Sequence, residues 1–289
     1  MTSRIAPINA TGGEADFAVA DVGSLDEVRA AAHKAIGRYG RIDTWINNAG
    51  VAIYSALIDT PMDEHERLIR TNYFGAVHGA LTAVEHLREN GGALITVGSI
   101  ASDFPSPVMG AYSASKHAVK GYIESLRIEL IAAKLPISVA LIKPSGISTP
   151  IAQHAANHVV GEALIPPPVY DPDLVANAIL DAAEHCRSDI TVGGIGRLQA
   201  LAANHFSGIY AHLGGIIAPL LSNPNDPKTG EHNLFRPFDD NIERSITEPG
   251  RTFSVSAPFG RHPAVFTGAA LAIVAAVLTV FRLRKQSTR

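Results

Sequence analysis

Short apolar runs rich in β-branched residues alternate along the chain with longer segments in which apolar residues recur every three or four positions. The short runs predict buried strands over residues 17–21, 42–46, 93–98, 137–142 and 189–192. The longer segments predict helices over residues 24–38, 62–89, 111–133 and 172–186. Strands that alternate with helices are typical of βαβ units, so the pattern predicts an α/β domain whose parallel sheet is covered on both faces.

Two segments of different character follow the last predicted strand. Residues 197–221 form an apolar helical stretch interrupted by glycines, which predicts either a packing helix or a contact with a membrane surface. Residues 222–263 are rich in Pro, Asn and charged residues. We therefore predict a domain over residues 1–221 and an extended linker over residues 222–263.

The C-terminal end holds 18 residues without a charge, 264–281, followed by a basic tail, 282–289, that begins Arg-Leu-Arg-Lys. A helix of that length measures about 27 Å, close to the roughly 30 Å of a bilayer's hydrocarbon core. Its apolar residues go all round, without the polar face of a surface helix. The segment therefore predicts a transmembrane helix that anchors the chain, and a buried C-terminal helix is the alternative.

Composition and charge exclude several classes of function. A single cysteine, Cys186, excludes an internal disulfide framework and a Cys-built metal site. The net charge is −3, and residues 264–289 hold four basic residues and no acidic one, so the rest of the chain is more acidic and a poor binder of nucleic acid. His154 and His158 share a helical spacing, but no nearby carboxylate or cysteine completes a metal site, and we predict none.

The polar residues that suit acid–base chemistry lie at the ends of predicted elements. Tyr112 and Lys116 are four residues apart near the start of a predicted helix and so share a face. An ammonium close to a phenol stabilises the phenolate, so we expect Lys116 to lower the pKa of Tyr112. Ser99 ends a predicted strand, where its hydroxyl can bind a substrate oxygen, and Asn72 lies inside a predicted helix, where its amide can hold a water for proton relay.

The order and spacing of these residues resemble a known family. Asn47-Asn48-Ala49-Gly50 follows a predicted strand, Asn72 comes next, and Ser99 lies 13 residues before the tyrosine of Tyr112-Ser-Ala-Ser-Lys116. Over residues 17–192 this pattern is similar to the short-chain dehydrogenase/reductase family. The resemblance implies a Rossmann-type, doubly wound parallel sheet that uses NAD or NADP.

The resemblance also implies a role for each matching residue. Its catalytic set is Asn72, Ser99, Tyr112 and Lys116, with Tyr112 as the general acid/base. Its cofactor-binding set is Asp21, Val22, Asn48, Ala49, Gly50, Tyr112, Lys116, Ile147 and Thr149. In the second set Asp21 and Val22 meet the adenine ring, Lys116 also holds the nicotinamide ribose, and Ile147 and Thr149 contact the carboxamide. Ser145 stands where the family usually has glycine.

One part of the family pattern is missing from this sequence. The family begins with a strand, the turn T-G-x-x-x-G-x-G and a helix, whose glycines let the backbone approach the cofactor diphosphate. Thr11-Gly12-Gly13 lies too close to residues 17–21 to supply that unit. We therefore expect an N-terminally truncated domain that lacks its first βαβ unit. The alternative is a degenerate protein that no longer binds nucleotide.

The missing unit has a consequence for the sheet. In the family strand order, its absence leaves a gap of roughly 14 Å between residues 17–21 and residues 42–46. Either the first strand slides inward, or it loses its ladder and the next strand becomes an exposed edge.

Together these observations predict an oxidoreductase that moves a hydride between a nicotinamide and a carbonyl or secondary alcohol. The apolar segment 150–170 favours a hydrophobic small-molecule substrate. A non-catalytic, membrane-tethered protein of the same fold, and an enzyme with a buried C-terminal helix, are the alternatives. The resemblance further implies a homo-oligomer formed through helices 62–89 and 111–133. We expect a single C-terminal span with the domain in the cytoplasm. The basic tail also favours the cytoplasm, and because one span cannot place both ends on the same side, the topology stays open.

Overall fold

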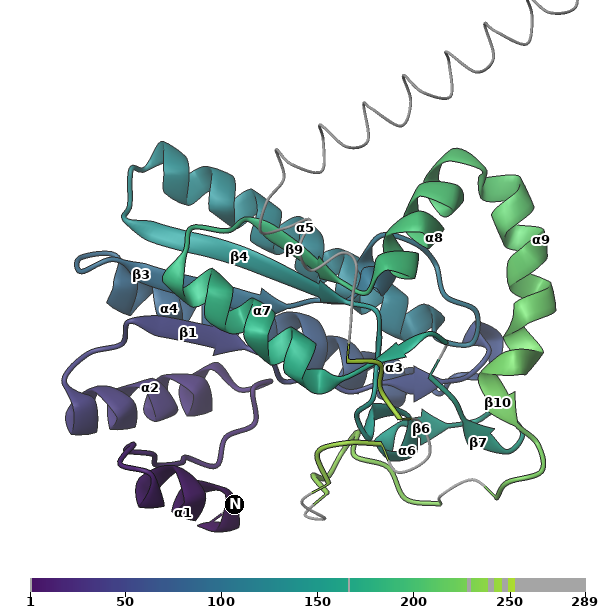
Figure 1. The fold of residues 1–289 in the computed structure, drawn as a ribbon, viewed down its shortest axis with the longest axis horizontal. Helices are drawn as coiled ribbons and strands as arrows, with labels where there is room; N and C mark the ends of the chain where they lie inside the picture. The colour runs from purple at the N-terminus through teal and green to yellow at the C-terminus, as the bar shows by residue number, and fades with distance from the viewer. Residues whose placement is uncertain (1, 166, 228–229, 239–241, 246–248, 253–289) are drawn as a thin grey trace, which may run out of the picture.

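Four parallel strands form the main sheet of the protein (Figure 1). The computed structural model describes residues 2–165, 167–227, 230–238, 242–245 and 249–252. The strands are β1 (Thr44–Asn47), β3 (Gly92–Val97), β4 (Ile137–Pro144) and β9 (Asp189–Val192), in the spatial order β1-β3-β4-β9. The register pairs Thr44 with Ala93 and Gly92 with Ile137, so the carboxyl ends of these strands meet at one edge of the sheet.

Helices cover both faces of this sheet, as the sequence pattern predicts. The helices before and between the strands are α1 (Thr2–Ala10), α2 (Leu25–Tyr39), α3 (Met62–Ile69), α4 (Gly75–Leu87), α5 (Gly110–Ala132) and α7 (Pro172–Glu184). Leu94 and Leu141 face α4 and α5 in one apolar cluster, while Ile95 and Ile142 face α7 in another. Successive strand residues thus alternate between two cores, which confirms a doubly wound α/β fold.

The predicted strand at residues 17–21 is not formed, which corrects the sequence prediction. Of the two outcomes expected for it, the structure shows the loss of the ladder: among the described residues, 17–21 pair with no strand. Val19 is 80% exposed, and the backbone is held by side chains instead, for example by Lys34 Nζ, 2.6 Å from the Phe17 oxygen. A strand without a neighbour within hydrogen-bonding reach gains no ladder energy, and β1 becomes the edge, with Ile46 46% exposed.

Short two-stranded pieces surround the carboxyl edge of the main sheet. They pair β2 (Ile53–Tyr54) with β6 (Ala156–Asn157), β5 (Gly146–Ile147) with β8 (Val169–Tyr170), and β7 (Glu162–Ala163) with β10 (Ser222–Asn223). A short helix, α6 (Ile151–His154), lies among them. An apolar cluster joins residues of β2, β6 and α6 with Met109 and Tyr112. The segment 150–170 is therefore packed against the start of α5.

The predicted linker is docked on the domain wherever the structure describes it, so the prediction of an extended linker over residues 222–263 is wrong for those parts. Leu234 is buried in the apolar cluster beneath α3, and Arg67 Nε donates to its carbonyl oxygen at 2.9 Å. Arg251 N donates to Val169 O at 2.9 Å, and Asp171 N donates to Arg251 O at 3.0 Å. A few buried apolar side chains and backbone hydrogen bonds hold this segment on the domain, although its composition is mostly polar. We call residues 230–252 the strap.

Two helices connect β9 to the strap: α8 (Gly194–His205) and α9 (Ser207–Ile217), which project from the body of the domain in Figure 1. Among the described residues no helix is both long and apolar enough to cross a bilayer. The predicted membrane anchor, residues 264–281, and the basic tail lie outside the described residues.

Candidate active site

The side chains of Tyr112 and Ser99 meet at the carboxyl edge of the sheet. Ser99 follows β3 and caps a short 3-10 helix, η3 (Ile100–Ser102), by accepting a hydrogen bond from Ala101 N at 3.1 Å. Tyr112 lies in the first turn of α5, and its hydroxyl is close enough to the Ser99 side chain for Ser99 to lower the pKa of the phenol. Both residues are buried. The structure thus brings together the pair that the sequence places 13 residues apart.

Lys116 lies one helical turn beyond Tyr112, and its ammonium is buried. Its Nζ is 5.7 Å from the centre of the Tyr112 ring and donates a hydrogen bond to Val97 O at 3.1 Å. Burial lowers the pKa of Lys116 to about 8, because a charge removed from water is less stable than a neutral amine. At neutral pH the side chain remains mostly protonated and has donors to offer a ligand beside it.

The expected lowering of the pKa of Tyr112 is not found in this chain. Burial raises the pKa of Tyr112, and the hydrogen bond with Ser99 offsets only part of that rise. The prediction considered the charge of Lys116 and left out desolvation, which penalises a buried phenolate. Tyr112 is consequently held as a neutral phenol, the form that can give up a proton.

Asn72 lies in a π-helical turn, η2 (Arg70–Phe74), between α3 and α4. Its Oδ1 accepts from Val51 N at 2.8 Å, while its Nδ2 donates to Val51 O at 2.9 Å and to Ser115 Oγ at 3.0 Å. The side chain expected to hold a water is thus engaged with protein partners. It fixes the segment that follows β1 against α5, and π-turns of this kind recur at functional sites.

A cavity of about 100 Å³ lies along β1 and β3 beside Lys116. Its lining includes four residues of the predicted site: Asn48, Ala49, Asn72 and Lys116. Val22 lines it too, because Gly75 lets the Val22 side chain approach α4. Gly50 lies just outside, where an added Cβ would be 3.5 Å from Asn72 Oδ1 and 3.7 Å from Lys116 Nζ. The cavity thus brings five other residues of the predicted site close to Lys116: Val22, Asn48, Ala49, Gly50 and Asn72.

Asp21, predicted beside Val22 in the cofactor site, is tied to the protein. Its Oδ2 pairs with Arg67 Nη1 at 2.7 Å and its Oδ1 accepts from Gly23 N at 2.9 Å. The hydrogen bond from Arg67 holds the pKa of the Asp21 carboxyl below its usual value. This anion fixes the unpaired segment 17–21 to α3.

Ile147 and Thr149 lie after β4 and are not among the residues that line the cavity. Ile147 belongs to β5, which pairs with β8, and Thr149 N donates to Ile147 O at 2.7 Å. Ser145, the departure from the family pattern, donates to Gly193 O at 3.2 Å. These contacts order the loop but do not place its side chains at Lys116.

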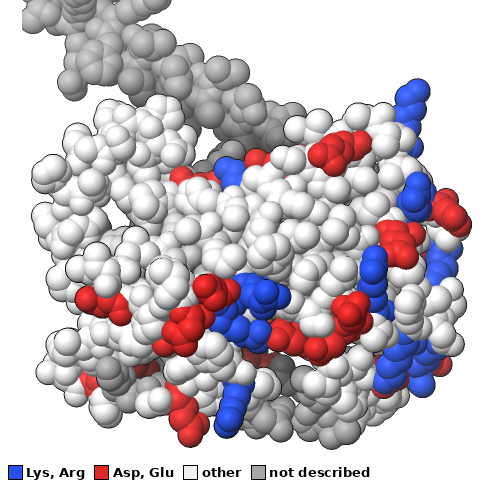
Figure 2. Space-filling view, turned by 180° about the vertical axis from the view of Figure 1, so that it is seen from behind, with Lys and Arg blue, Asp and Glu red and all other residues white. Residues whose placement is uncertain are grey.

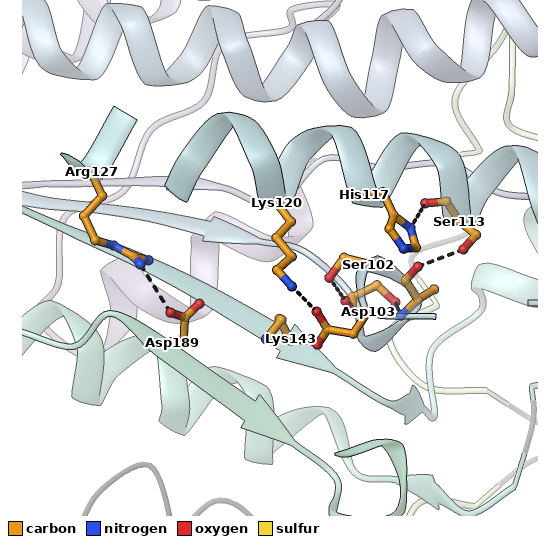
Figure 3. Close-up of polar contacts among 10 residues, drawn as sticks. Ser102, Asp103, Ser113, His117, Lys120, Arg127, Lys143 and Asp189 are labelled. Carbon is orange, nitrogen blue, oxygen red and sulfur yellow. Dashed lines mark hydrogen bonds and ion pairs between the residues drawn. The ribbon is translucent and has the colours of Figure 1, made fainter. Parts of the chain in front are cut away.

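A charged cluster that the sequence did not predict lies behind Ser99. Asp103 follows η3 and pairs with Lys120 of α5 at 2.5 Å and with Lys143 of β4 at 2.9 Å (Figure 3). Burial raises the pKa of Asp103, but the hydrogen bonds from the two lysines outweigh it and keep that pKa below its usual value. One carboxylate therefore joins η3, α5 and β4. No sequence signal was available, because the partners lie 17 and 40 residues away.

Two serines complete the connection between η3 and α5. Ser113 Oγ donates to Ala101 O at 2.8 Å, and Ser102 Oγ donates to Ser99 O at 2.6 Å (Figure 3). Both hydroxyls are buried. Together with Asp103 they fix the backbone that presents Ser99 to Tyr112.

Comparison with known proteins agrees with this geometry. The family model described as short chain dehydrogenase matches residues 1–159. An uncharacterized oxidoreductase of Bacillus subtilis, YxnA, is 38% identical over 193 residues, which cover 66% of this chain and 54% of the relative. A 3-ketodihydrosphingosine reductase of Bacteroides thetaiotaomicron is 36% identical over 138 residues, 47% of this chain and 51% of the relative. The chain spans about half the length of these relatives.

Solved structures share the fold. A short chain dehydrogenase from Burkholderia cenocepacia, crystallised in complex with NADP, matches with a TM-score of 0.55 and 25% identity over 70% of this chain and 77% of that one. The family model spans more than half of this chain, and the serine, tyrosine and lysine of its pattern meet in one place. The chain therefore belongs to the short-chain dehydrogenase/reductase family.

Proposed function

We propose that this protein is an NAD(P)-dependent oxidoreductase that moves a hydride between a nicotinamide and a carbonyl or secondary alcohol. The observation that carries the proposal is that the buried side chains of Tyr112 and Ser99 come together, with Lys116 Nζ 5.7 Å from the centre of the Tyr112 ring. A buried neutral phenol beside a second hydroxyl suits proton transfer to and from a substrate oxygen. The family's oxidoreductase relatives and the NADP complex of the Burkholderia protein support the same chemistry.

Each residue has a role in the reductive direction. Ser99 Oγ orients the substrate oxygen, and Tyr112 Oη gives its proton to the developing alkoxide. Lys116 places a positive charge beside the resulting phenolate, which opposes the penalty of burial. Asn72 keeps the segment after β1 in position, as its contacts with Val51 show. The bound dinucleotide supplies the hydride.

The described residues fit part of that cofactor. A buried ammonium with donors to spare and the small residues Ala49 and Gly50 suit a ribose and a flat ring. The cavity of about 100 Å³ is smaller than the roughly 300–1,000 Å³ of a small-molecule site, so it accommodates a portion of a dinucleotide. The 289 residues contain no glycine-rich turn of the family type for the diphosphate. We therefore assign to these residues the nucleoside-binding part of the site.

The substrate in this proposal is hydrophobic. Tyr112 belongs to an apolar cluster with Met109, Ala152, Ala155 and Ile165, so the segment 150–170 brings apolar surface to the phenol. A relative named as a 3-ketodihydrosphingosine reductase supports a long-chain carbonyl. We further propose that residues 264–281 anchor the chain in a membrane, which is where such substrates reside, with the catalytic domain in the cytoplasm. The homo-oligomer implied by the resemblance stays a prediction.

The proposal is tested by hydride transfer with NADH and NADPH against a series of alkyl ketones of increasing length. Tyr112→Phe is expected to lower turnover at least about a hundredfold, because it removes the proton donor and keeps the ring. Tyr122→Phe, on the same helix and outside the cluster around Tyr112, is the control and should keep activity. Retained turnover in Tyr112→Phe would contradict the role. A chain that folds but binds neither NADH nor NADPH would favour the non-catalytic, membrane-tethered alternative.

The anchor has its own test. The full chain is expected to stay with membranes after carbonate extraction, whereas a chain that ends after residue 252 should be released. Release of the full chain would favour the buried C-terminal helix instead.

A further inference from the structure

Helix α9 is an apolar helix with very little packing. Of its residues whose exposure is described, all but Tyr210 and Gly214 are exposed. Tyr210 contacts the Phe104 ring at 5.9 Å between centroids and donates from its hydroxyl to Pro105 O at 3.2 Å. Gly214 lies next to Pro107. The helix therefore touches the domain along one narrow line, and the remainder of its circumference is open.

The open side carries large apolar side chains. Ile209 is 64% exposed and Ile216 is 71% exposed, and Leu213 lies between them on the same helical face. Phe206 just before α9 and Leu201 of α8 are large, apolar and exposed as well. We call these five residues the α9 face. Exposed apolar surface of this kind marks a contact with another apolar body.

The sequence that carries the α9 face is free of charge. No Asp, Glu, Lys or Arg occurs between residues 198 and 225. In Figure 2 the upper left part of the molecule, where α8 and α9 project, is white, whereas the charged residues gather elsewhere. An uncharged helix with apolar residues on its open side is stable in an apolar environment and not as a solvated surface helix.

We propose that the α9 face lies on a lipid bilayer and is buried in its interface. This inference rests on the membrane anchor of the proposed function. From residue 252 to residue 264 the chain spans 12 residues, at most about 40 Å, so an inserted anchor keeps the domain within about its own diameter of the bilayer. The proposed anchor therefore holds a bilayer close enough to cover the α9 face. Helices with Phe, Ile and Leu on one side insert into this interface.

The α9 face is connected to the reaction site. Ala200 and Ala203 of α8 and Tyr210 of α9 pack on Ile100 and Phe104, which lie at the start of η3 and just after it. Ser99 caps that same helix. A bilayer against α9 therefore lies on the side of the domain where α8 and α9 pack on the segment that follows Ser99.

The experiment places a polarity-sensitive fluorophore on the face. In a full-length Cys186→Ser background, Ile209→Cys and Leu213→Cys are labelled one at a time and mixed with vesicles of equal parts phosphatidylcholine and phosphatidylserine. Ile128→Cys is the matched control, because Ile128 is an isoleucine of α5 that is 69% exposed and lies outside the α9 face. Sedimentation of the vesicles reports the anchor separately.

The expected result is a blue shift of emission at residues 209 and 213 when vesicles are added, quenched by lipids with a spin label in the acyl chain, and no shift at residue 128. Sedimentation with vesicles but no shift at residues 209 and 213 would overturn the α9 contact and leave the anchor standing. Failure to sediment would overturn the anchor and this inference with it. Emission that is already blue-shifted at residues 209 and 213 relative to residue 128 without vesicles would overturn the inference as well. If that shift grows with protein concentration, a second copy covers the α9 face. If it does not, another part of this chain covers it.

Discussion

Asn72 and Val51 exchange two hydrogen bonds, 2.8 Å and 2.9 Å long, between the amide of one side chain and the backbone of the other residue. The amide pairs with the backbone of the segment between β1 and β2 as a neighbouring strand would, at the edge of the main sheet as the structure describes it. A third bond, to Ser115, connects the same amide to α5. The position of Asn48, Ala49 and Gly50 relative to Lys116 thus depends on one side chain.

Asn72→Ala is expected to lower both stability and activity. The buried N–H and C=O of Val51 lose their partner, which costs about 1–3 kcal/mol of the free energy of unfolding. Chemical denaturation followed by circular dichroism measures this loss. Asn204→Ala, at an exposed asparagine of α8, is the control and should leave the midpoint unchanged. An unchanged midpoint for Asn72→Ala would show that the two bonds contribute nothing.

Asp103→Asn should destabilise the fold next to Ser99, because Asp103 joins η3, α5 and β4 there. It leaves Lys120 and Lys143 without their shared anion, at a cost of about 2–3 kcal/mol, less than for a fully buried pair because Lys120 is partly exposed. The exposed pair of Asp43 and Arg41 gives the control, and Asp43→Asn should change stability by less than about 1 kcal/mol.

The effect of Asp103 depends on pH with a defined sign. Its pKa in the folded protein is lowered from 3.8, so its contribution is complete above that value and is lost as the pH falls through the lower folded pKa. The difference in stability between the wild type and Asp103→Asn should therefore shrink below about pH 4. A constant difference down to the acid transition would contradict the ion-pair explanation.

Lys116→Met is expected to remove activity and to stabilise the fold at neutral pH. The folded pKa of about 8 lies below the ordinary 10.5, so charging the buried amine destabilises the native state by about 3 kcal/mol at pH 7. Between these two values the unfolded chain binds more protons, and the wild type gains stability as the pH rises.

Thermal denaturation of both proteins from pH 7 to 10.5 measures this effect. The wild type should approach Lys116→Met as the pH rises through the window. Lys34→Met, at a half-exposed lysine, is the control and should show no such convergence. Parallel curves for the wild type and Lys116→Met would mean that Lys116 is not desolvated.

The edge strand offers a test of solubility. Ile46 is 46% exposed on β1, the edge of the main sheet in the part of the chain that the structure describes, a position prone to edge-to-edge association. Ile46→Lys should lower the light scattering of the protein as it is concentrated. Its melting temperature should stay nearly unchanged, because a surface substitution costs only a few tenths of a kcal/mol, which corresponds to about 1 °C. Leu180→Lys, at a leucine of α7 that is 60% exposed, is the control. Equal effects of both variants would point to general charge and not to the edge.

The elements that a local pattern encodes could be predicted from the sequence. The four strands of the main sheet begin and end within about two residues of the predicted ranges, because β-branched runs bounded by turns carry that information. Tyr112, Ser99 and Lys116 could also be placed, since the carboxyl ends of parallel strands meet at one edge. Residues 62–89, however, were predicted as one helix, and the π-turn at Asn72 divides them.

Features that depend on distant partners could not be predicted in the same way. Residues 17–21 have the composition of a strand, but a strand needs a neighbour, and the composition of one segment does not say whether the neighbour exists. The pairing of Asp103 with Lys143 and the docking of Leu234 join segments far apart in the sequence. The pKa of Tyr112 was predicted in the wrong direction because burial is a property of the whole fold.

The strap sets a limit on how the protein can be shortened for expression or crystallisation. A researcher who wishes to remove the apolar run at residues 264–281 would naturally cut at the start of the polar region, near residue 222. That cut would uncover the apolar cluster that Leu234 joins and would remove the bridge between Arg251 and Tyr170 of β8. A version of this chain without the apolar run should therefore end after residue 252, because a shorter one would lose the contacts of Leu234 and Arg251 with the domain.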